Sequence, residues 1–165
     1  DKNTARDNGI LAFFTFGEGY HNYHHIFEYD YRNGVKWWQF DPTKWMIKAL
    51  SYVGLTKNLR KTPEERIEKA KLEMQLKYAQ DKAITLPDAE EILTKMQHEY
   101  EVLMHKMSEF YSTKKRLMNL KKKDIQKSYE SFELDFKCKE LKKTLDVQKQ
   151  KWRSIYAFYF ELRTA

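Results

Sequence analysis

The feature that most constrains the fold is the absence of glycine and proline after Pro87. These two residues most often end helices, so a long stretch without them favours long, uninterrupted helices. Within this stretch, apolar residues recur three and four positions apart in two separate runs. The first run comprises Leu93, Met96, Tyr100, Leu103, Met107, Phe110 and Leu117, with Lys114 as an interruption. The second run comprises Cys138, Leu141, Leu145, Trp152, Ile155, Tyr159 and Leu162, with Gln148 as an interruption.

Such spacing is typical of helices that pack along one another. A cluster of charged residues at 121–124 separates the two runs, and we expect the chain to reverse there. We therefore predict a helical hairpin, with one helix over residues 88–119 and another over 125–163. The alternative is a single unbroken helix, which buries its apolar stripe only by dimerising. The lysines between 114 and 151 face either solvent or anionic lipid head groups.

Two further helices are expected before the hairpin. The sequence Thr-Pro-Glu-Glu at 62–65 has the form of a capping box, and it predicts a heavily charged, mostly exposed helix as far as residue 82. The sequence Asp-Pro at 41–42 combines an N-cap residue with proline at the first helical position. It predicts a helix over 43–53 that ends at Gly54.

The helix predicted over 43–53 carries an apolar stripe, and Lys44 lies off the centre of that stripe. The stripe comprises Trp45, Met46, Ala49, Leu50 and Val53. Trp-rich amphipathic helices with basic flanks often lie in the membrane interface. Two interpretations remain open, either an interfacial helix with Trp37, Trp38 and Trp45 at the membrane surface or a helix packed on a protein core.

Three of the five histidines lie at 21, 24 and 25, with the spacing H-x-x-H-H. On a helix, residues three and four apart share a face, so the imidazole of His21 is able to reach the same metal position as those of His24 and His25. Neutral imidazole is the commonest protein ligand for transition metals, and such a cluster suits iron, copper or zinc. The alternative is a chance run of surface histidines, or a pair satisfied by hydrogen bonds.

Two acidic residues close to the histidines, Glu28 and Asp30, have two alternative roles. Metal-bound imidazoles usually donate their second N–H to a carboxylate or a carbonyl, which gives either residue an orienting role. Alternatively, both are solvated charges. Ahead of the histidines, residues 10–16 are apolar on nearly all sides and predict a helix buried in protein or lipid.

Little other chemistry is indicated. The sequence has no Gly-rich phosphate loop, no Ser-His-Asp order and no C-x-x-C pair, and it has no apolar run of membrane-spanning length. The single cysteine, Cys138, fits a reducing compartment, and we expect it to be structural. His98 and His105 are expected on a helix surface. The net charge of +7 is compatible with nucleic acid, but no recognised motif supports that partner, so we predict none.

The histidine run lies in a longer motif that resembles a known family. The sequence GEGYHNYHH at 17–25, followed by YDY at 29–31, closely resembles the third histidine box of the membrane-bound acyl-CoA Δ9 fatty acid desaturases. DKN at 1–3 and RDN at 6–8 also fit that family, and WWQFDPTKW at 37–45 with GLT at 54–56 resembles its bacterial branch. The resemblance is strong over residues 1–60, weaker over 61–80, and indicates nothing definite about 85–165.

The resemblance implies a four-span membrane enzyme with a cytosolic cap and two irons, held by histidines from three boxes and one further ligand. Such enzymes insert a cis double bond into a saturated fatty acyl chain, carried by coenzyme A or by lipid. They use O2 and electrons from a small redox carrier. The resemblance places His21, His24 and His25 at iron-ligand positions, and it gives Glu18 and Asn22 supporting roles.

We therefore expect an all-α chain. It would comprise a histidine-box segment with an interfacial helix over 1–60, a charged helix and linker over 61–84, and a helical hairpin tail over 85–165. The first two histidine boxes and the membrane spans of the family are absent from this sequence, so we expect the C-terminal piece of a desaturase at the cytosolic face of the membrane. Alone it would be inactive, because three imidazoles cannot hold two irons. The alternatives are a helical interaction module, suggested by 88–163, and a hydroxylase with similar histidine boxes.

Overall fold

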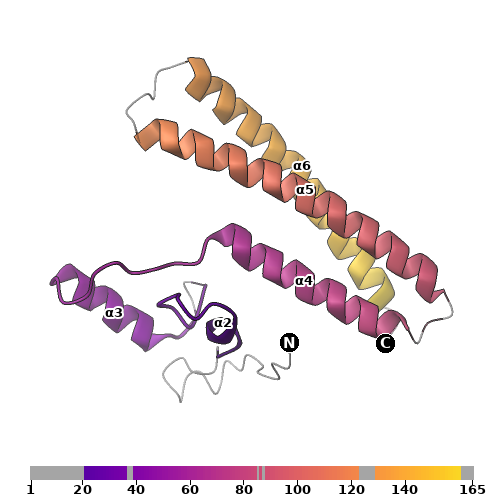
Figure 1. Cartoon of the computed structure of the whole chain (residues 1–165), viewed down its shortest axis with the longest axis horizontal. Coiled ribbons are helices and arrows are strands. Elements are labelled where there is room, and N and C mark those ends of the chain that lie inside the picture. Colours follow the sequence, from indigo (N-terminus) through magenta and orange to yellow (C-terminus); the bar gives the residue numbers. More distant parts are fainter. Residues whose placement is uncertain (1–20, 37–38, 85, 87, 123–128, 161–165) are drawn as a thin grey trace. The chain divides into compact units, whose positions relative to one another are not determined.

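The computed structural model describes residues 21–36, 39–84, 86, 88–122 and 129–160. Within these residues every regular element is an α-helix (Figure 1), which confirms the predicted all-α class. The helices are α2 (His21–Ile26), α3 (Pro42–Tyr52), α4 (Glu64–Ala83), α5 (Ala89–Lys122) and α6 (Tyr129–Phe160). The chain divides into two compact units with a boundary between Glu64 and Glu65, and each unit is described by itself.

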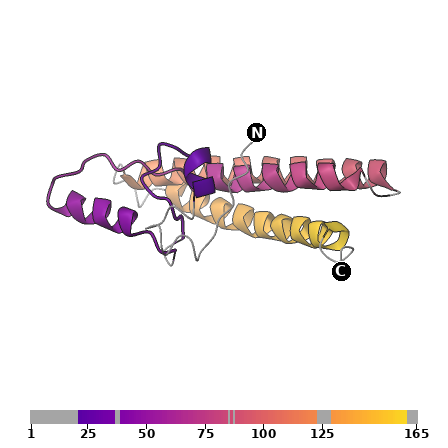
Figure 2. The ribbon, with the colours of Figure 1, turned by 90° about the horizontal axis from the view of Figure 1, so that it is seen from below.

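The predicted helical hairpin is present in the second unit. The helices α5 and α6 pack against each other, as Figures 1 and 2 show from two directions. They are 34 and 32 residues long. Apart from Leu162, which lies outside the described residues, the predicted apolar runs line the core of this unit, and five of their side chains are at most 1% exposed. These five are Met96, Leu103 and Met107 of α5, and Leu145 and Trp152 of α6.

A buried polar network crosses this interface at the point where Gln148 interrupts the apolar run. Gln148 donates through Nε2 to Oε2 of Glu99 at 2.7 Å, and its Oε1 accepts from Nζ of Lys106 at 3.3 Å. The other oxygen of Glu99 accepts from Nζ of Lys151 at 2.6 Å. Burial raises the pKa of Glu99, but the bonds from Lys151 and Gln148 outweigh burial and lower the pKa below its ordinary value. The polar residue that interrupts the apolar run therefore has its hydrogen-bond partners on the facing helix.

The helix α4 completes the core of the second unit. Its buried side chains join the cluster formed by α5 and α6; they are Leu72, Leu76, Ala79 and Ala83. Both carboxylate oxygens of Glu68 accept from Nζ of Lys149 at 2.8 Å, and the Tyr111 hydroxyl donates to Oε2 of Glu68 at 3.1 Å. In addition, the indole N–H of Trp152 donates to Oε1 of Gln75 at 2.8 Å. The heavy charge of α4 predicted its exposed face, but it gave no indication of these partners.

In the first unit, α3 begins and ends as predicted. Oδ1 of Asp41 accepts from the backbone N–H of Lys44 at 2.9 Å, which caps the helix. At the other end, Gly54 adopts a φ of +79°, and the backbone N–H of Leu55 donates to the carbonyl of Leu50 at 3.0 Å. This is a Schellman motif, in which glycine occupies the left-handed position at little steric cost.

The start of α4 differs from the predicted capping box. The backbone N–H of Thr62 donates to Oδ2 of Asp30 at 2.7 Å, so a distant carboxylate takes the place expected of Glu65. The helix predicted over 10–16 lies outside the described residues. Among the helices that are described, none is both long enough and apolar enough to cross a membrane.

Candidate metal centre and its carboxylate anchor

The histidines at 21, 24 and 25 all lie on α2, so their backbones have the helical spacing on which the metal hypothesis depends. The His25 side chain is exposed. The side chains of His21, Asn22 and His24 lie outside the described set, as does all of Glu18. Among the side chains that the structure does describe, no three His, Cys, Asp or Glu residues are placed to hold a metal ion. The metal-binding role of the three histidines therefore remains a prediction.

Tyr23 anchors α2 to a buried carboxylate. Its hydroxyl donates to Oδ2 of Asp30 at 2.6 Å, and its ring contacts the ring of Phe27, one turn later, with the ring centres 5.1 Å apart. Burial, followed by the hydrogen bond to Asp30, raises the pKa of Tyr23 to about 12. The hydroxyl therefore stays protonated and able to donate near neutral pH. Because Tyr23 lies between His21 and His24 in sequence, this anchor restrains the rotation of the helix that carries them.

Asp30 is the centre of the anchor. Its Oδ1 accepts from the backbone N–H and Nε of Arg32, at 3.0 and 2.9 Å, while its Oδ2 accepts from Nη2 of Arg32 at 2.7 Å. The same Oδ2 accepts from Tyr23 and from the N–H of Thr62. Burial raises the pKa of this carboxyl, but the bonds from Arg32, Tyr23 and Thr62 outweigh burial and hold the pKa well below its usual range. Hydrogen bonding to Asp30 in turn raises the pKa of Arg32.

The two carboxylates near the histidines thus have different surroundings. Glu28 is exposed, as expected of a solvated charge, whereas Asp30 is buried and bonded to three residues. The described contact from Asp30 to the histidine helix runs through the Tyr23 phenol. The sequence pattern gave Tyr23 and Arg32 no role of their own, and it assigned Thr62 only to the capping box of the following helix. No local pattern indicates that Thr62 bonds to Asp30, because the two residues lie 32 positions apart.

A second buried carboxylate organises the turn that follows the anchor. Oδ2 of Asp41 accepts from the backbone N–H groups of Asn33 and Gly34, each at 2.8 Å. Beneath the same turn, Nζ of Lys44 donates to the carbonyls of Gly34 and Lys36, at 3.0 and 3.4 Å. Burial lowers the pKa of Lys44. The sequence indicated only that Lys44 lies off the apolar stripe of α3, whereas the structure buries it in this turn.

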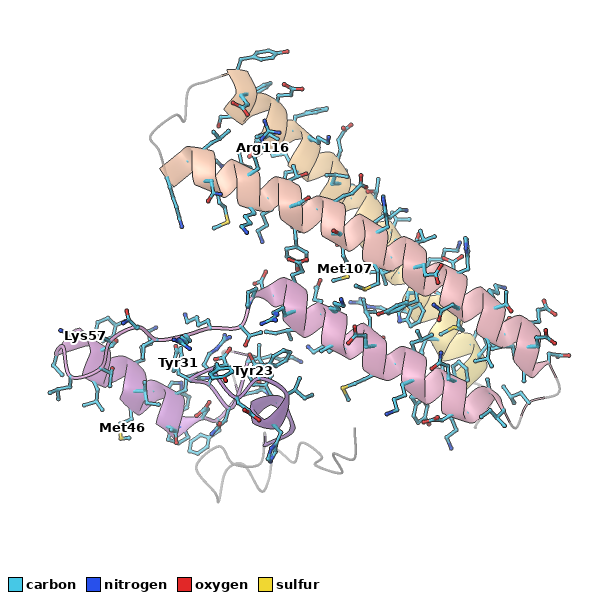
Figure 3. The ribbon with its side chains drawn as sticks, viewed as in Figure 1. Tyr23, Tyr31, Met46, Lys57, Met107 and Arg116 are labelled. Carbon is cyan, nitrogen blue, oxygen red and sulfur yellow. The ribbon has the colours of Figure 1, made fainter. Side chains whose placement is uncertain are left out.

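The apolar stripe of α3 faces outward. Trp45 is 47% exposed, and Met46 and Val53 are more exposed still; Met46 points away from the helix in Figure 3. The stripe is therefore not packed into a core of the described residues. Trp37 and Trp38 lie outside that set. Residues 36–61 carry six basic side chains and one acidic side chain, and one of each, Lys44 and Asp41, is buried.

Comparison with known proteins shows partial similarity to desaturases. Over 77 residues the chain is 52% identical to acyl-CoA desaturase 1 of Saccharomyces cerevisiae. The matched stretch is 47% of this chain and 15% of that protein. It is 48% identical over 61 residues to an acyl-CoA C20 Delta5-desaturase of Anemone leveillei, covering 37% of this chain and 19% of that protein. It is also 48% identical over 60 residues to the sn-1 stearoyl-lipid 9-desaturase of Synechocystis, a match that covers 36% of this chain and 19% of that protein.

The chain spans less than a fifth of the length of each of these relatives. They come from a fungus, a plant and a cyanobacterium, so the similarity does not select the bacterial branch expected from residues 37–45. Their names also differ in double-bond position and in the carrier of the acyl chain. No family model and no solved structure matches the chain. What is established is similarity over part of the chain to acyl-CoA and lipid desaturases.

Proposed function

We propose that this chain supplies the third histidine box of a membrane-bound di-iron acyl desaturase, with His21, His24 and His25 as iron ligands. The observation that carries the proposal is that the three histidines lie on the single helix α2, and residues three and four apart on a helix share a face. The partial similarity to desaturases supports the same assignment. Imidazole is a suitable donor for redox iron. The remaining ligands would come from residues outside this sequence, because three imidazoles are too few for two irons.

The proposed reaction removes one hydrogen from each of two adjacent CH2 groups of a saturated acyl chain. Two electrons from a small redox carrier and two protons complete the reduction of O2 to two molecules of water, which balances the reaction. When bound, the di-iron centre supplies the oxidising power for the unactivated C–H bonds. We propose an acyl-CoA substrate and a cis double bond at Δ9.

In this proposal the residues of the anchor position the ligands. The buried Asp30 carboxylate holds Tyr23, and Tyr23 fixes the helix on which the histidines lie. Arg32 and Thr62 fix Asp30 in turn, which links α2 to the residues just before α4. Glu18 and Asn22 retain the supporting roles that the motif implies. Ligands held by such surrounding contacts need less reorganisation when a metal binds.

We further propose that α3 lies in the membrane interface on the cytosolic side, with Trp37, Trp38 and Trp45 at the level of the lipid head groups. The exposed apolar stripe and the excess of basic residues over 36–61 support this location. Aromatic side chains with a polar edge are enriched at this depth of a bilayer.

The test is to express the full-length gene in a desaturase-deficient host and to measure unsaturated fatty acids. His24→Ala is expected to abolish them, whereas the control His98→Ala, at an exposed position of α5, is expected to leave them unchanged. Normal levels of unsaturated fatty acids in the His24→Ala strain would contradict the iron-ligand role. Mass spectrometry of the products gives the double-bond position, and a hydroxylated product would favour the hydroxylase alternative.

A further inference from the structure

One end of the α5–α6 hairpin carries both exposed aromatic side chains and an excess of positive charge. This end comprises residues 112–122 of α5 and 129–143 of α6, and it is called the hairpin tip below. Arg116 of α5, labelled in Figure 3, pairs with Glu130 of α6 at 2.6 Å. Lys121 lies 3.6 Å from Asp135. These ion pairs join the two helices at the tip.

The aromatic side chains of the tip follow one face of α6. Tyr129, Phe132 and Phe136 are 83%, 74% and 58% exposed. Their spacing of three and four places them on a single face. Ser131 and Leu134, between them in sequence, are buried and so mark the opposite face. Three neighbouring aromatic rings on the outside of a helix form an apolar stripe that the described residues leave uncovered.

The tip also holds the surplus charge of the bundle formed by α4, α5 and α6. It has nine basic and four acidic residues, a net charge of +5, and its α5 portion has five basic residues and no acidic one. The other end of the bundle, made of residues 73–83, 88–101 and 149–160, has six basic and seven acidic residues, a net charge of −1. Two of the four acidic residues at the tip, Glu130 and Asp135, are already paired.

We propose that the hairpin tip docks on an anionic lipid bilayer, with Tyr129, Phe132 and Phe136 in the interface and the α5 basic residues at the head groups. Aromatic rings flanked by lysines suit the boundary between acyl chains and head groups, where each surface finds a matching environment. Negatively charged lipids attract basic side chains that lie within one Debye length of the surface, about 10 Å at 0.1 M salt. The proposal is independent of the iron chemistry.

The first test locates the contact. The chain carries Cys138→Ser and a single new cysteine labelled with the fluorophore NBD, either Tyr129→Cys at the tip or the control Ser154→Cys, an exposed position on α6 at the other end of the bundle. Vesicles contain phosphatidylcholine and phosphatidylserine in a two-to-one ratio, with a nitroxide on some acyl chains. NBD at residue 129 is expected to be quenched, while NBD at residue 154 stays bright. Vesicle binding without quenching at residue 129 would overturn the proposal and leave the interfacial role of α3 standing.

The second test measures the contribution of charge with the intact chain. Lys115→Gln with Lys122→Gln is expected to lower the partition coefficient on these vesicles about 25-fold, since each basic residue near an anionic surface contributes a factor of about five. Added salt should weaken binding of the unmodified chain and have less effect on this variant. An unchanged partition coefficient would contradict the proposal.

The third test uses the aromatic stripe. Phe132→Ser should reduce binding without changing the melting temperature, because this ring is mostly exposed. The same change at α3, Trp45→Ser, separates the two surfaces, since quenching of NBD at residue 129 should survive it. Two other results would overturn the proposal. One is a dimer that Phe132→Ser dissociates, and the other is binding to RNA that depends on Lys115 and Lys122 without any binding to vesicles.

Discussion

At the scale of single residues, Asp30 and Arg32 illustrate how a buried charge is held in this chain. The Asp30 side chain is fully buried, and that of Arg32 is 15% exposed. Removing water from a carboxylate is costly unless hydrogen bonds replace it, and here Arg32, Tyr23 and the Thr62 amide do so. The contact connects three segments that have no sequence periodicity in common.

Asp30→Asn should lower the free energy of unfolding of the first unit by about 3 kcal/mol, because it leaves the largely buried guanidinium of Arg32 without its counter-charge. Hydrogen exchange of peptides from residues 21–62 measures the change. The matched control is Glu28→Gln, an exposed neighbour, which should stay within about 0.5 kcal/mol of the unmodified chain. Equal effects of the two substitutions would show that the contacts of Asp30 contribute nothing.

The pH dependence of the anchor is predicted at both ends of the pH range. The pKa of Tyr23 is raised in the folded chain, so the stability it contributes is present below about pH 10 and is lost as pH rises through about 12. The pKa of Asp30 is lowered, so its contribution is present above about pH 4 and is lost only as pH falls through the lowered value.

Tyr23→Phe should therefore remove part of the loss of stability between about pH 10 and 12. It should leave the loss of stability at acid pH, which comes from Asp30, in place. Unfolding by urea across this pH range, followed by hydrogen exchange of α2, measures the difference. The control is Tyr29→Phe, because Tyr29 is nearby and exposed. If both variants show the alkaline profile of the unmodified chain, the bond from Tyr23 to Asp30 does not contribute to stability.

At the scale of elements, polar residues within the apolar runs specify how the helices pair. Gln148 meets Glu99, which lies 49 positions earlier on the facing helix. The other interruption, Lys114, places its Nζ 5.7 Å from the ring centres of Phe110 and Tyr111 on its own helix, so this contact does not bear on the register. Polar contacts in an otherwise apolar helix seam can select a single register, since other registers leave them unpaired.

Gln148→Leu should destabilise the hairpin by about 2 kcal/mol, because Glu99 stays buried and loses a hydrogen-bond donor. The double change Glu99→Leu and Gln148→Leu should recover most of this loss, since no buried polar group is then left unpaired. Urea unfolding monitored by circular dichroism measures both variants, with the exposed Gln97→Leu as the control. A double variant as unstable as the sum of the single changes would contradict the pairing.

At the scale of the whole molecule, the boundary between Glu64 and Glu65 separates two units that are stabilised by different interactions. The first depends on two buried carboxylates: Asp30 accepts from side-chain and backbone donors, and Asp41 accepts from backbone donors. The second depends on a continuous apolar core contributed by α4, α5 and α6. The similarity to desaturases covers at most 47% of the chain among the relatives described above.

The two units should respond separately to substitution. Asp30→Asn should increase hydrogen exchange over residues 21–62 and leave α5 and α6 unchanged. Trp152→Ala should do the reverse, lowering the stability of the second unit by about 3–5 kcal/mol because it removes a large buried ring. Loss of protection in both units after either substitution would contradict their independence.

The sequence by itself determined the features that repeat within a few residues. The three-four spacing identified the hairpin helices and most of their core, Asp41 and Gly54 marked the ends of α3, and H-x-x-H-H indicated the candidate metal ligands. Each of these rests on contacts along one turn of a helix, so neighbouring residues suffice to specify it.

Only the tertiary structure decided the long-range partners. It pairs Asp30 with Thr62, Gln148 with Glu99, and Lys149 with Glu68. The last two residues lie 81 positions apart. It also placed α4 in the core and left the tip of α6 exposed. A buried polar group needs a partner, but which partner it meets depends on the path of the whole chain, and no local pattern specifies that path.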